Sequence, residues 1–292
     1  MIYPNLLDLI ELDESIQKDI FKYDCLLGEE VEPYVKAYMN GELTIQQAIE
    51  MLDPLKTKEI SVYAIHLLFV LRASEYLYLK YKKNNLGTEL FIDTMKDIKY
   101  KTDECIKELG IVGITVLWWF DGFFKLERFG FGRLQYDVCI SEEDIELSRY
   151  TLKKGDFFIQ THIPSGSPLE HELCIESYKM AYEFFKNRLS NNILPIKCES
   201  WLLFPPYIDQ GVFAKGTNIY NFATDYERVG QVAKETLMPA HSVFNMDYNG
   251  NVEELPQNTG LQKRFVSYIK NGGTFGRGIG VLLFDGRKIV NK

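Results

Sequence analysis

The spacing of apolar residues follows two different rules along the chain. Between residues 6 and 109 apolar positions recur every three or four residues, which is typical of amphipathic helices. This spacing predicts three helices, over residues 6–23, 60–82 and 88–109. Thr44 followed by Gln47 is a capping-box sequence that begins a further helix. Gly110 suits a helix end, because glycine readily adopts the left-handed conformation needed there.

The helical spacing stops near residue 130. The aromatic segment 111–127 is predicted to be helical, although its apolar spacing alone does not distinguish a helix from a strand. The run Phe-Gly-Phe-Gly at 129–132 breaks the pattern and is read as a turn before a strand. We therefore predict two domains, over residues 1–130 and 131–292.

Alternation of apolar and polar residues replaces the helical spacing in the second half, and predicts a mixed sheet with a few helices. Strands are predicted over residues 133–140, 156–163, 196–203, 218–226 and 242–247. Helices are predicted over residues 169–188 and 260–270. Asp285-Gly286 marks the turn of a final hairpin, and the glycine-rich run 276–280 is read as a bend before it. The fold class is α+β, with a helical N-terminal domain and a mixed-sheet α/β domain.

Composition limits the classes of partner. The chain of 292 residues has 46% apolar and 25% charged residues, as expected for globular domains. Its net charge is -8 and it has no basic stripe, so we expect no nucleic-acid partner. The most apolar segments are too short or too interrupted to span a bilayer, so we expect no membrane partner. The oligomeric state is not set by the sequence.

The cysteines indicate a reducing compartment. Five are scattered along the chain without a Cys-x-x-Cys pair, which excludes the usual zinc and redox spacings, and we expect no metal site. The N-terminus lacks a basic segment before an apolar run, so no secretory signal is expected. Together these features favour a soluble cytoplasmic protein.

The segment 157–188 is predicted to run from a strand through a loop into a helix. Ser167 is the predicted N-cap, Pro168 takes the first helical position, and Glu170 completes a capping box. A helix start presents free N–H groups and a partial positive charge, which suit a phosphate. The alternative is a purely structural cap, since every such connection needs one.

Four motifs in this order resemble a known family. They read LERFGFGRLQY (126–136), HIPSGSPL (162–169), CESWLL (198–203) and LPQNTGLQ (255–262). This set is similar to bacterial acyltransferase-like proteins, which join a helical N-acyltransferase N-terminal domain to a C-terminal domain with a GNAT-like fold. The resemblance covers nearly the whole chain.

The resemblance implies an N-acyltransferase that moves an acyl group directly from acetyl-CoA or another acyl-CoA to a small-molecule amine. It also implies that the strands 156–163 and 196–203 splay apart. Backbone groups near Ile163 would bind the pantetheine arm, and the loop residues Ser165, Gly166, Ser167 and Leu169 would bind the pyrophosphate.

One departure from the family pattern keeps a second function open. The loop has one glycine and two prolines, and it lacks the several convergent N–H groups of the usual phosphate loop. No Lys or Arg lies between Gln160 and Lys179. The alternative is a non-catalytic small-molecule-binding protein on a degenerate GNAT-like fold.

Strand alternation yields the candidate catalytic groups. Glu199 and His162 are polar residues on central strands and are candidates for the general base that deprotonates the amine. Equally, Glu199 could form a structural ion pair and His162 could tether the loop. Gln160, on the face of His162, and Trp201, on the face of Glu199, are candidates for the substrate pocket.

Other groups receive weaker assignments. The resemblance implies a tyrosine after the third strand that protonates the leaving thiolate, and Tyr207 is placed there. Cys198 with His162 or His241 would make a cysteine nucleophile, but a lone strand cysteine usually packs as a small hydrophobe. His171 is expected to face solvent.

Overall fold

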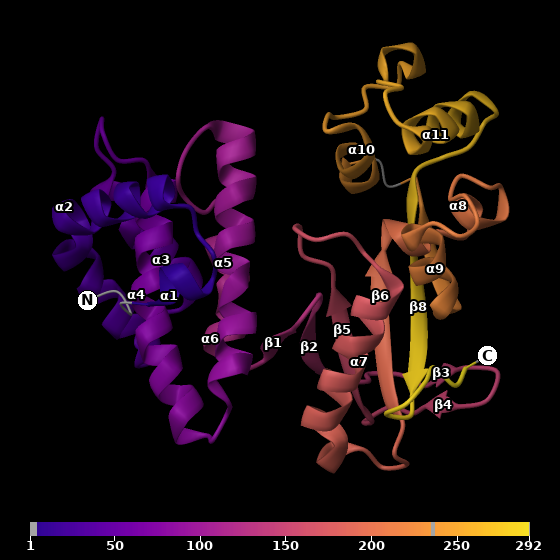
Figure 1. Cartoon of the computed structure of the whole chain (residues 1–292), viewed down its shortest axis with the longest axis horizontal. Coiled ribbons are helices and arrows are strands. Elements are labelled where there is room, and N and C mark those ends of the chain that lie inside the picture. The colour runs from indigo at the N-terminus through magenta and orange to yellow at the C-terminus, as the bar shows by residue number, and fades with distance from the viewer. Residues whose placement is uncertain (1–4, 235–236, 292) are drawn as a thin grey trace. The chain divides into compact units, whose positions relative to one another are not determined.

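The structure is a computed structural model that describes residues 5–234 and 237–291. The chain forms two compact units, coloured indigo to magenta and, for the most part, orange to yellow in Figure 1. Unit 1 is Met1–Asp137 with Ile163–Gly166, and unit 2 is Val138–His162 with Ser167–Lys292. The loop Ile163–Gly166 therefore belongs to unit 1 although the chain on both sides of it belongs to unit 2.

Unit 1 is helical before its hairpin, as predicted. Its helices are α1 (Leu6–Leu9), α2 (Glu14–Met39), α3 (Ile45–Leu52), η1 (Asp53–Leu55), α4 (Val62–Lys83), α5 (Thr88–Leu109), η2 (Leu117–Phe120) and α6 (Asp121–Phe124). The predicted capping box at Thr44 and the left-handed end of α5 at Gly110 are both confirmed. The helix predicted over 111–127 was wrong, because only the short η2 and α6 form there.

Helix α4 is the central helix of unit 1. By length and composition it could cross a membrane, but 67% of its most apolar stretch is buried inside the structure, as in a core helix. Its Arg72 side chain is only 7% exposed and is bound by Asp24 and Glu32 of α2. Gly28 leaves the room for this guanidinium, since a Cβ at that position would overlap Arg72. A buried charge needs such paired partners.

A hairpin follows the helices and packs on α5. It consists of β1 (Arg128–Phe131) and β2 (Leu134–Ile140), paired antiparallel. Gly130 lies against the α5 backbone, where its N–H donates to Thr94 Oγ1 at 3.0 Å. Gly132 turns the hairpin with φ of +60°. The Phe-Gly-Phe-Gly run is thus a strand with its turn, and the strand β1 was not predicted.

A polar network fixes the hairpin to the helices of unit 1. The Asp97 carboxylate on α5 is completely buried and accepts hydrogen bonds from Trp119 Nε1 and Gln135 Nε2, at 2.9 and 2.7 Å. Burial raises its pKa above the usual range, and the positive charge of Lys101 acts against that shift. Arg128 stacks 3.5 Å over the Trp119 ring.

Unit 2 is built on a mixed sheet, as predicted. Its strands lie in the order β5 (Phe157–His162), β6 (Leu194–Ser200), β8 (Gly276–Phe284) and β7 (Glu227–Ala233). β5 and β6 are parallel, and the other two pairs are antiparallel. A small second sheet joins β3 (Ile145–Glu146) to β4 (Thr151–Leu152). The final hairpin is reduced to one bridge between Phe284 and Ile289, and the predicted bend 276–280 is the start of β8.

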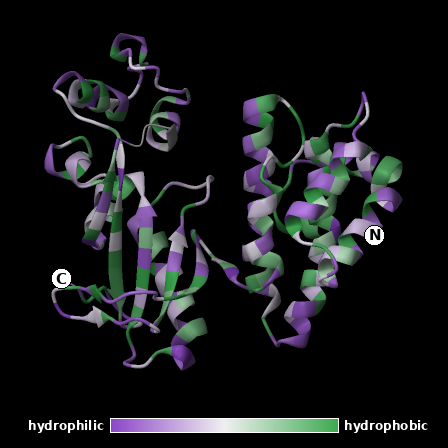
Figure 2. Cartoon of the chain, turned by 180° about the vertical axis from the view of Figure 1, so that it is seen from behind, coloured by the Kyte–Doolittle hydropathy of each residue, from purple (hydrophilic) through white to green (hydrophobic). Residues whose placement is uncertain are grey.

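Helices cover one face of this sheet and extend it into a lobe. They are α7 (His171–Phe185), η3 (Lys186–Arg188), η4 (Trp201–Leu203), α8 (Pro205–Asp209), α9 (Asn218–Asp225), α10 (Leu237–Phe244), η5 (Val252–Glu254) and α11 (Gly260–Lys270). The strands predicted over 218–226 and 242–247 were wrong, since α9 occupies the first segment up to Asp225 and the second begins in α10 and forms no strand. Figure 2 shows the sheet of unit 2 from behind, where no described helix of that unit crosses the strands.

We predict that Gly130→Ala destabilises the protein. The new Cβ would lie 2.6 Å from the carbonyl oxygen of Asp93, so the hairpin or α5 must move. Overpacking of this kind costs about 1–3 kcal/mol. Gly230→Ala is the matched strand control, because its Cβ would meet only the Ile279 side chain at 3.4 Å. Thermal melts that show equal losses for both variants would contradict the close-packing explanation.

Candidate functional site

The pairing between the parallel strands β5 and β6 stops before the carboxyl ends of both strands. Their register runs from Ile159 with Ile196 to Thr161 with Cys198 and stops there. Both strands continue, β5 to His162 and β6 to Ser200. In open α/β sheets ligands bind beyond the carboxyl ends of parallel strands. The unpaired carboxyl ends of β5 and β6 are therefore the candidate site of unit 2.

One face of these two strands carries the predicted polar residues. The register pairs Gln160 with Lys197, which places both side chains on one face. His162 and Glu199 follow by alternation on that same face. Three predicted site residues, Gln160, His162 and Glu199, are thus brought together on one sheet face.

Glu199 has a charged partner on the neighbouring strand. Its Oε1 lies 2.9 Å from Nε of Arg277 on β8, and the two side chains are 34% and 40% exposed. This is the structural ion pair that the sequence left open as the alternative to general-base chemistry. A carboxylate in such a half-exposed pair contributes little to stability.

The opposite face of the strands is closed by buried hydroxyl groups. Tyr226 Oη lies 3.4 Å from Thr161 Oγ1 and 3.3 Å from Tyr178 Oη, so α7 and the end of α9 cover this face. Cys198 is 1% exposed here, and burial raises the pKa of its thiol far above the usual range. No histidine of the described residues forms a hydrogen bond with its sulfur. This environment gives no support to a cysteine nucleophile.

Tyr207 and Trp201 lie in the aromatic core of the lobe. β6 ends at Ser200, so Trp201 belongs to η4, and the strand alternation used to place it does not apply. The centroid of its ring lies 5.9 Å from the ring centroid of Phe213 and 6.1 Å from that of Phe265. Tyr207 is fully buried, and its hydroxyl accepts a hydrogen bond from the Gly276 N–H at 3.0 Å. These contacts give both residues a packing role, and their functional roles stay predictions.

The predicted phosphate loop is fastened to α5 within unit 1. Ser165 Oγ donates to Glu104 Oε1 at 2.7 Å, and Arg133 donates to the carbonyl of Pro164 at 3.0 Å. Gly166 has φ of +118°, and a Cβ there would lie 2.6 Å from the Tyr100 ring. Ile163 precedes these residues at a half-buried position. The loop is thus shaped by its contacts with the first unit.

The helix after the loop begins later than predicted. α7 starts at His171, with Glu170 as its N-cap and no side-chain hydrogen bond to the cap. The capping box from Ser167 to Glu170 was therefore wrong. Ser167 is exposed and Leu169 is 9% exposed. The first N–H groups of α7 receive no side-chain cap and remain suited to an anion.

A histidine that the sequence placed in solvent has a buried partner. Nε2 of His171, in the first turn of α7, lies 2.9 Å from Oδ2 of Asp225 at the end of α9. The His171 side chain is 37% exposed and that of Asp225 is 7% exposed. Sequence reasoning missed this pair, because 54 residues separate its members.

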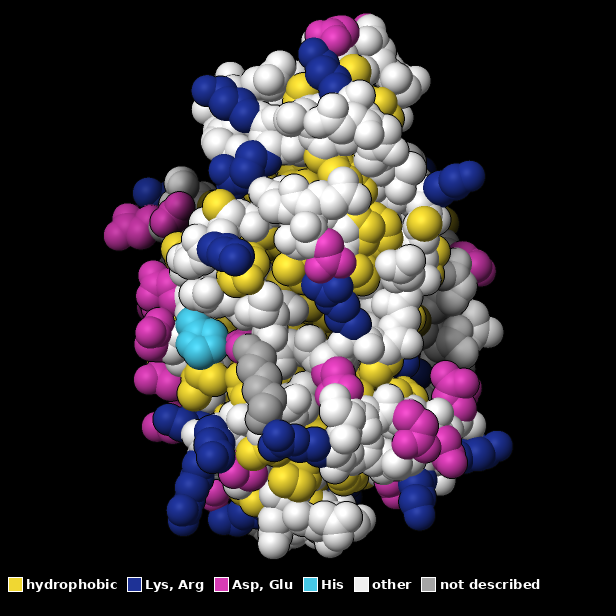
Figure 3. Space-filling model, turned by 90° about the vertical axis from the view of Figure 1, so that its right-hand side faces the viewer, with side chains coloured by type: hydrophobic (Ala, Val, Ile, Leu, Met, Phe, Trp, Pro, Cys, Tyr) yellow, Lys and Arg dark blue, Asp and Glu magenta, His cyan; other side chains and the backbone are white. Residues whose placement is uncertain are grey.

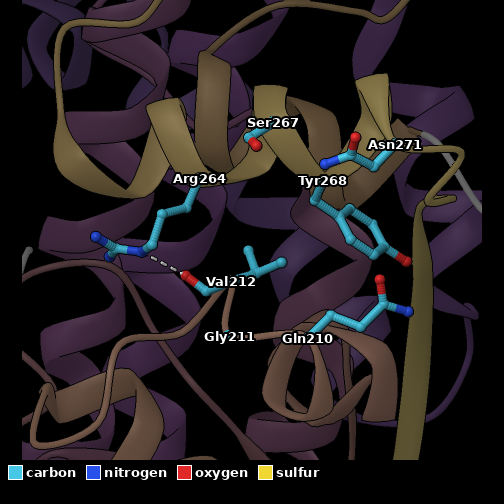
Figure 4. A pocket seen from close by; sticks show the side chains of 7 residues that line it. All are labelled: Gln210, Gly211, Val212, Arg264, Ser267, Tyr268 and Asn271. Atoms are coloured by element: carbon cyan, nitrogen blue, oxygen red, sulfur yellow. Dashed lines mark hydrogen bonds between the residues drawn. The ribbon is translucent and has the colours of Figure 1, made fainter.

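A small polar pocket lies in the lobe, between the loop after α8 and helix α11 (Figure 4). It is lined by Gln210, Gly211, Val212, Arg264, Ser267, Tyr268 and Asn271. Its volume is about 160 Å³. Pockets for drug-sized ligands measure about 300–1,000 Å³. Arg264 Nε donates to the Val212 carbonyl at 2.7 Å, which ties α11 to the loop. The pocket is too small for an acyl-CoA.

A second hollow of about 590 Å³ lies at the other end of the sheet. Its lining residues are Ile140, Ser141, Glu142, Lys154 and Gly155. Lys154 and Gly155 precede β5, so the hollow is at the opposite end of that strand from His162. Figure 3 shows basic and acidic side chains interspersed around apolar patches on one side of the molecule.

Comparisons with known proteins match both halves of the chain. The family model "N-acyltransferase N-terminal domain" matches residues 1–126, and the model "GNAT-like C-terminal domain" matches residues 129–282. No curated protein matches the sequence.

Solved structures of acyltransferases share the fold. The structures are complexes of an acyltransferase with decanoyl-CoA and teicoplanin, with decanoyl-CoA, and with CoA and 10C-teicoplanin. Each is 19% identical, with 95% of this chain and 86% of the other covered, at TM-scores of 0.70, 0.69 and 0.70. At this identity the likeness establishes the fold.

We predict that native Cys198 resists alkylation. Cys25 is exposed, whereas Cys198 is buried with a raised pKa, and the thiolate is the reactive form. Brief treatment with iodoacetamide followed by mass spectrometry should label Cys25 and leave Cys198 unmodified. All five cysteines should react in guanidinium chloride, which is the control. Rapid labelling of native Cys198 would restore the nucleophile hypothesis.

Proposed function

Since the chain belongs to the family that joins an N-acyltransferase N-terminal domain to a GNAT-like C-terminal domain, we propose that it transfers an acyl group from acyl-CoA to the amine of a small molecule. The observation that carries this proposal is that the pairing of the parallel strands β5 and β6 stops at Thr161 and Cys198, before both strands end. The unpaired residues are at the carboxyl ends of both strands, and the chain continues from β5 to the start of α7. We place the division between the two family domains near residue 130.

The donor we propose is an acyl-CoA of unspecified chain length. Structures with this fold contain decanoyl-CoA or CoA, and these ligands belong to those proteins. Acetyl-CoA, the donor suggested by the family resemblance, stays one member of the panel to be tested. The uncapped N–H groups of α7 support a place for the pyrophosphate. The acceptor we propose is a small molecule with a primary amine.

The reaction needs one proton to be moved. The amine nitrogen attacks the thioester carbonyl, a C–N bond forms, and the C–S bond breaks to release CoA. A base near the unpaired ends of β5 and β6 must take the proton that the amine loses. Glu199 and His162 are the predicted candidates, and the ion pair with Arg277 favours a structural role for Glu199.

A second function is supported by the loop itself. The loop has two prolines without N–H groups, and exposed Glu172 follows in the first turn of α7. Both features weaken phosphate binding. A non-catalytic binder of a smaller ligand on the same fold is therefore the competing function.

We predict that acyl-CoA thioesters raise the melting temperature. A ligand that binds the native state at about 100 times its Kd adds about 2.7 kcal/mol of stability. Decanoyl-, octanoyl- and acetyl-CoA should be compared with CoA, and ATP serves as the nucleotide control. The chain length with the largest shift identifies the donor class. If none of the thioesters shifts the melt or gives calorimetric heat, the binding-protein alternative replaces the transferase.

We predict that Glu199→Gln leaves turnover of the folded protein within about twofold, because the carboxylate is engaged by Arg277. Exposed ion pairs contribute about 0–1 kcal/mol, so the melting temperature should fall only slightly. Arg277→Gln is the matched control, since it breaks the same pair and leaves the carboxylate in place. A loss of about 10²–10⁴ in kcat for Glu199→Gln alone would instead identify Glu199 as the general base.

A further inference from the structure

The pair formed by His171 and Asp225 has the features of an oriented base. Asp225 is buried, and it lies at the C-terminal end of α9, where the helix dipole disfavours a negative charge. A carboxylate in such a position is costly unless it is bound by donors. Nε2 of His171 lies 2.9 Å from its Oδ2. The carboxylate thus fixes the imidazole in position.

The contact also selects the tautomer of a neutral His171. A carboxylate only accepts hydrogen bonds, so the neutral ring carries its proton on Nε2 and donates it to Asp225. Nδ1 then holds a lone pair. None of the described residues forms a hydrogen bond with Nδ1, and the side chain is 37% exposed. Nδ1 is therefore accessible to a proton donor from outside the protein.

The pair lies near the carboxyl end of β5. His171 is in the first turn of α7, and the start of that helix lies at the same edge of the sheet as the carboxyl end of β5. Tyr226 follows Asp225, and its hydroxyl lies 3.4 Å from Thr161, the last β5 residue paired with β6. Through Tyr226, Asp225 is thereby placed near the carboxyl end of β5, on the sheet face that α7 and the end of α9 cover.

We propose that His171 is the proton acceptor for the acyl acceptor and that Asp225 is its positioning residue, an assignment that rests on the proposed acyl transfer. Nδ1 takes the proton from the amine as the nitrogen bonds to the thioester carbon. The C–S bond breaks with its electron pair on sulfur, and the imidazolium returns the proton to give the free CoA thiol. The products are the amide and CoA, and no further reactant is needed.

The test measures release of CoA thiol from decanoyl-CoA. D-Glucosamine, L-lysine and spermidine are offered as amines, and a reaction without amine reports water as the acceptor. His171→Ala should lower kcat by about 10²–10⁴, the usual loss for a general base, with little change in the KM for decanoyl-CoA. Added imidazole should restore part of the activity to His171→Ala, an outcome that loss of a structural contact would not produce.

Asp225→Asn tests the positioning role with a side chain of nearly the same shape. It should lower kcat less than His171→Ala does, and the double variant should be no slower than His171→Ala alone. Equal melting temperatures for wild type and Asp225→Asn would separate orientation from folding. His162→Asn is the matched histidine control on β5 and should not respond to imidazole.

The outcomes separate this assignment from the proposed function. If wild type binds decanoyl-CoA but releases no thiol with any amine or with water, acyl transfer itself fails and the assignment fails with it. If wild type is active and His171→Ala keeps its kcat, or loses it without rescue by imidazole, the assignment is overturned while acyl transfer stands.

Discussion

The path of the chain in unit 2 depends on a close backbone contact at one glycine. Gly278 on β8 lies under η4, and a Cβ there would overlap the carbonyl of Leu203. The chain can cross β8 only because that position lacks a side chain, and the crossing lies directly after the end of β6 at Ser200. The aromatic core around Tyr207 and the lobe of α11 come after this crossing in the chain. Gly130 provides the same kind of contact in unit 1.

Long elements with clear end signals could be predicted from the sequence. Helices α4, α5 and α11 and strands β5 and β6 were found within a few residues, because spacing and caps agreed. The strand predicted over 218–226 was wrong, because the alternating aromatic and polar residues of this segment resemble the pattern of a strand. The side chain of Thr217, which caps α9, was the competing signal. At Ser167 a cap sequence was present without a helix start, since buried Leu169 follows and α7 begins only at His171.

The candidate site was predictable only in its sheet. Alternation placed Gln160, His162 and Glu199 on strands, and the register brought them to one face. Contacts across the sheet or between helices are not encoded in local spacing, so neither Arg277 beside Glu199 nor Asp225 beside His171 could be foreseen. The two pairs differ in how far their side chains are exposed to solvent. The Asp225 side chain is 7% exposed, whereas the two side chains of the other pair are 34% and 40% exposed.

The loop Ile163–Gly166 belongs to the GNAT-like half in the sequence and to unit 1 in the structure. It is encoded within the GNAT-like half, but its hydrogen bonds are made to Glu104 and Arg133 of unit 1. Transplanting the second half onto a different helical partner would leave Ser165 without Glu104, whereas Arg133 lies in the GNAT-like half and would move with the loop. A replacement of the helical half would therefore need to keep an acceptor for Ser165 at the position of Glu104.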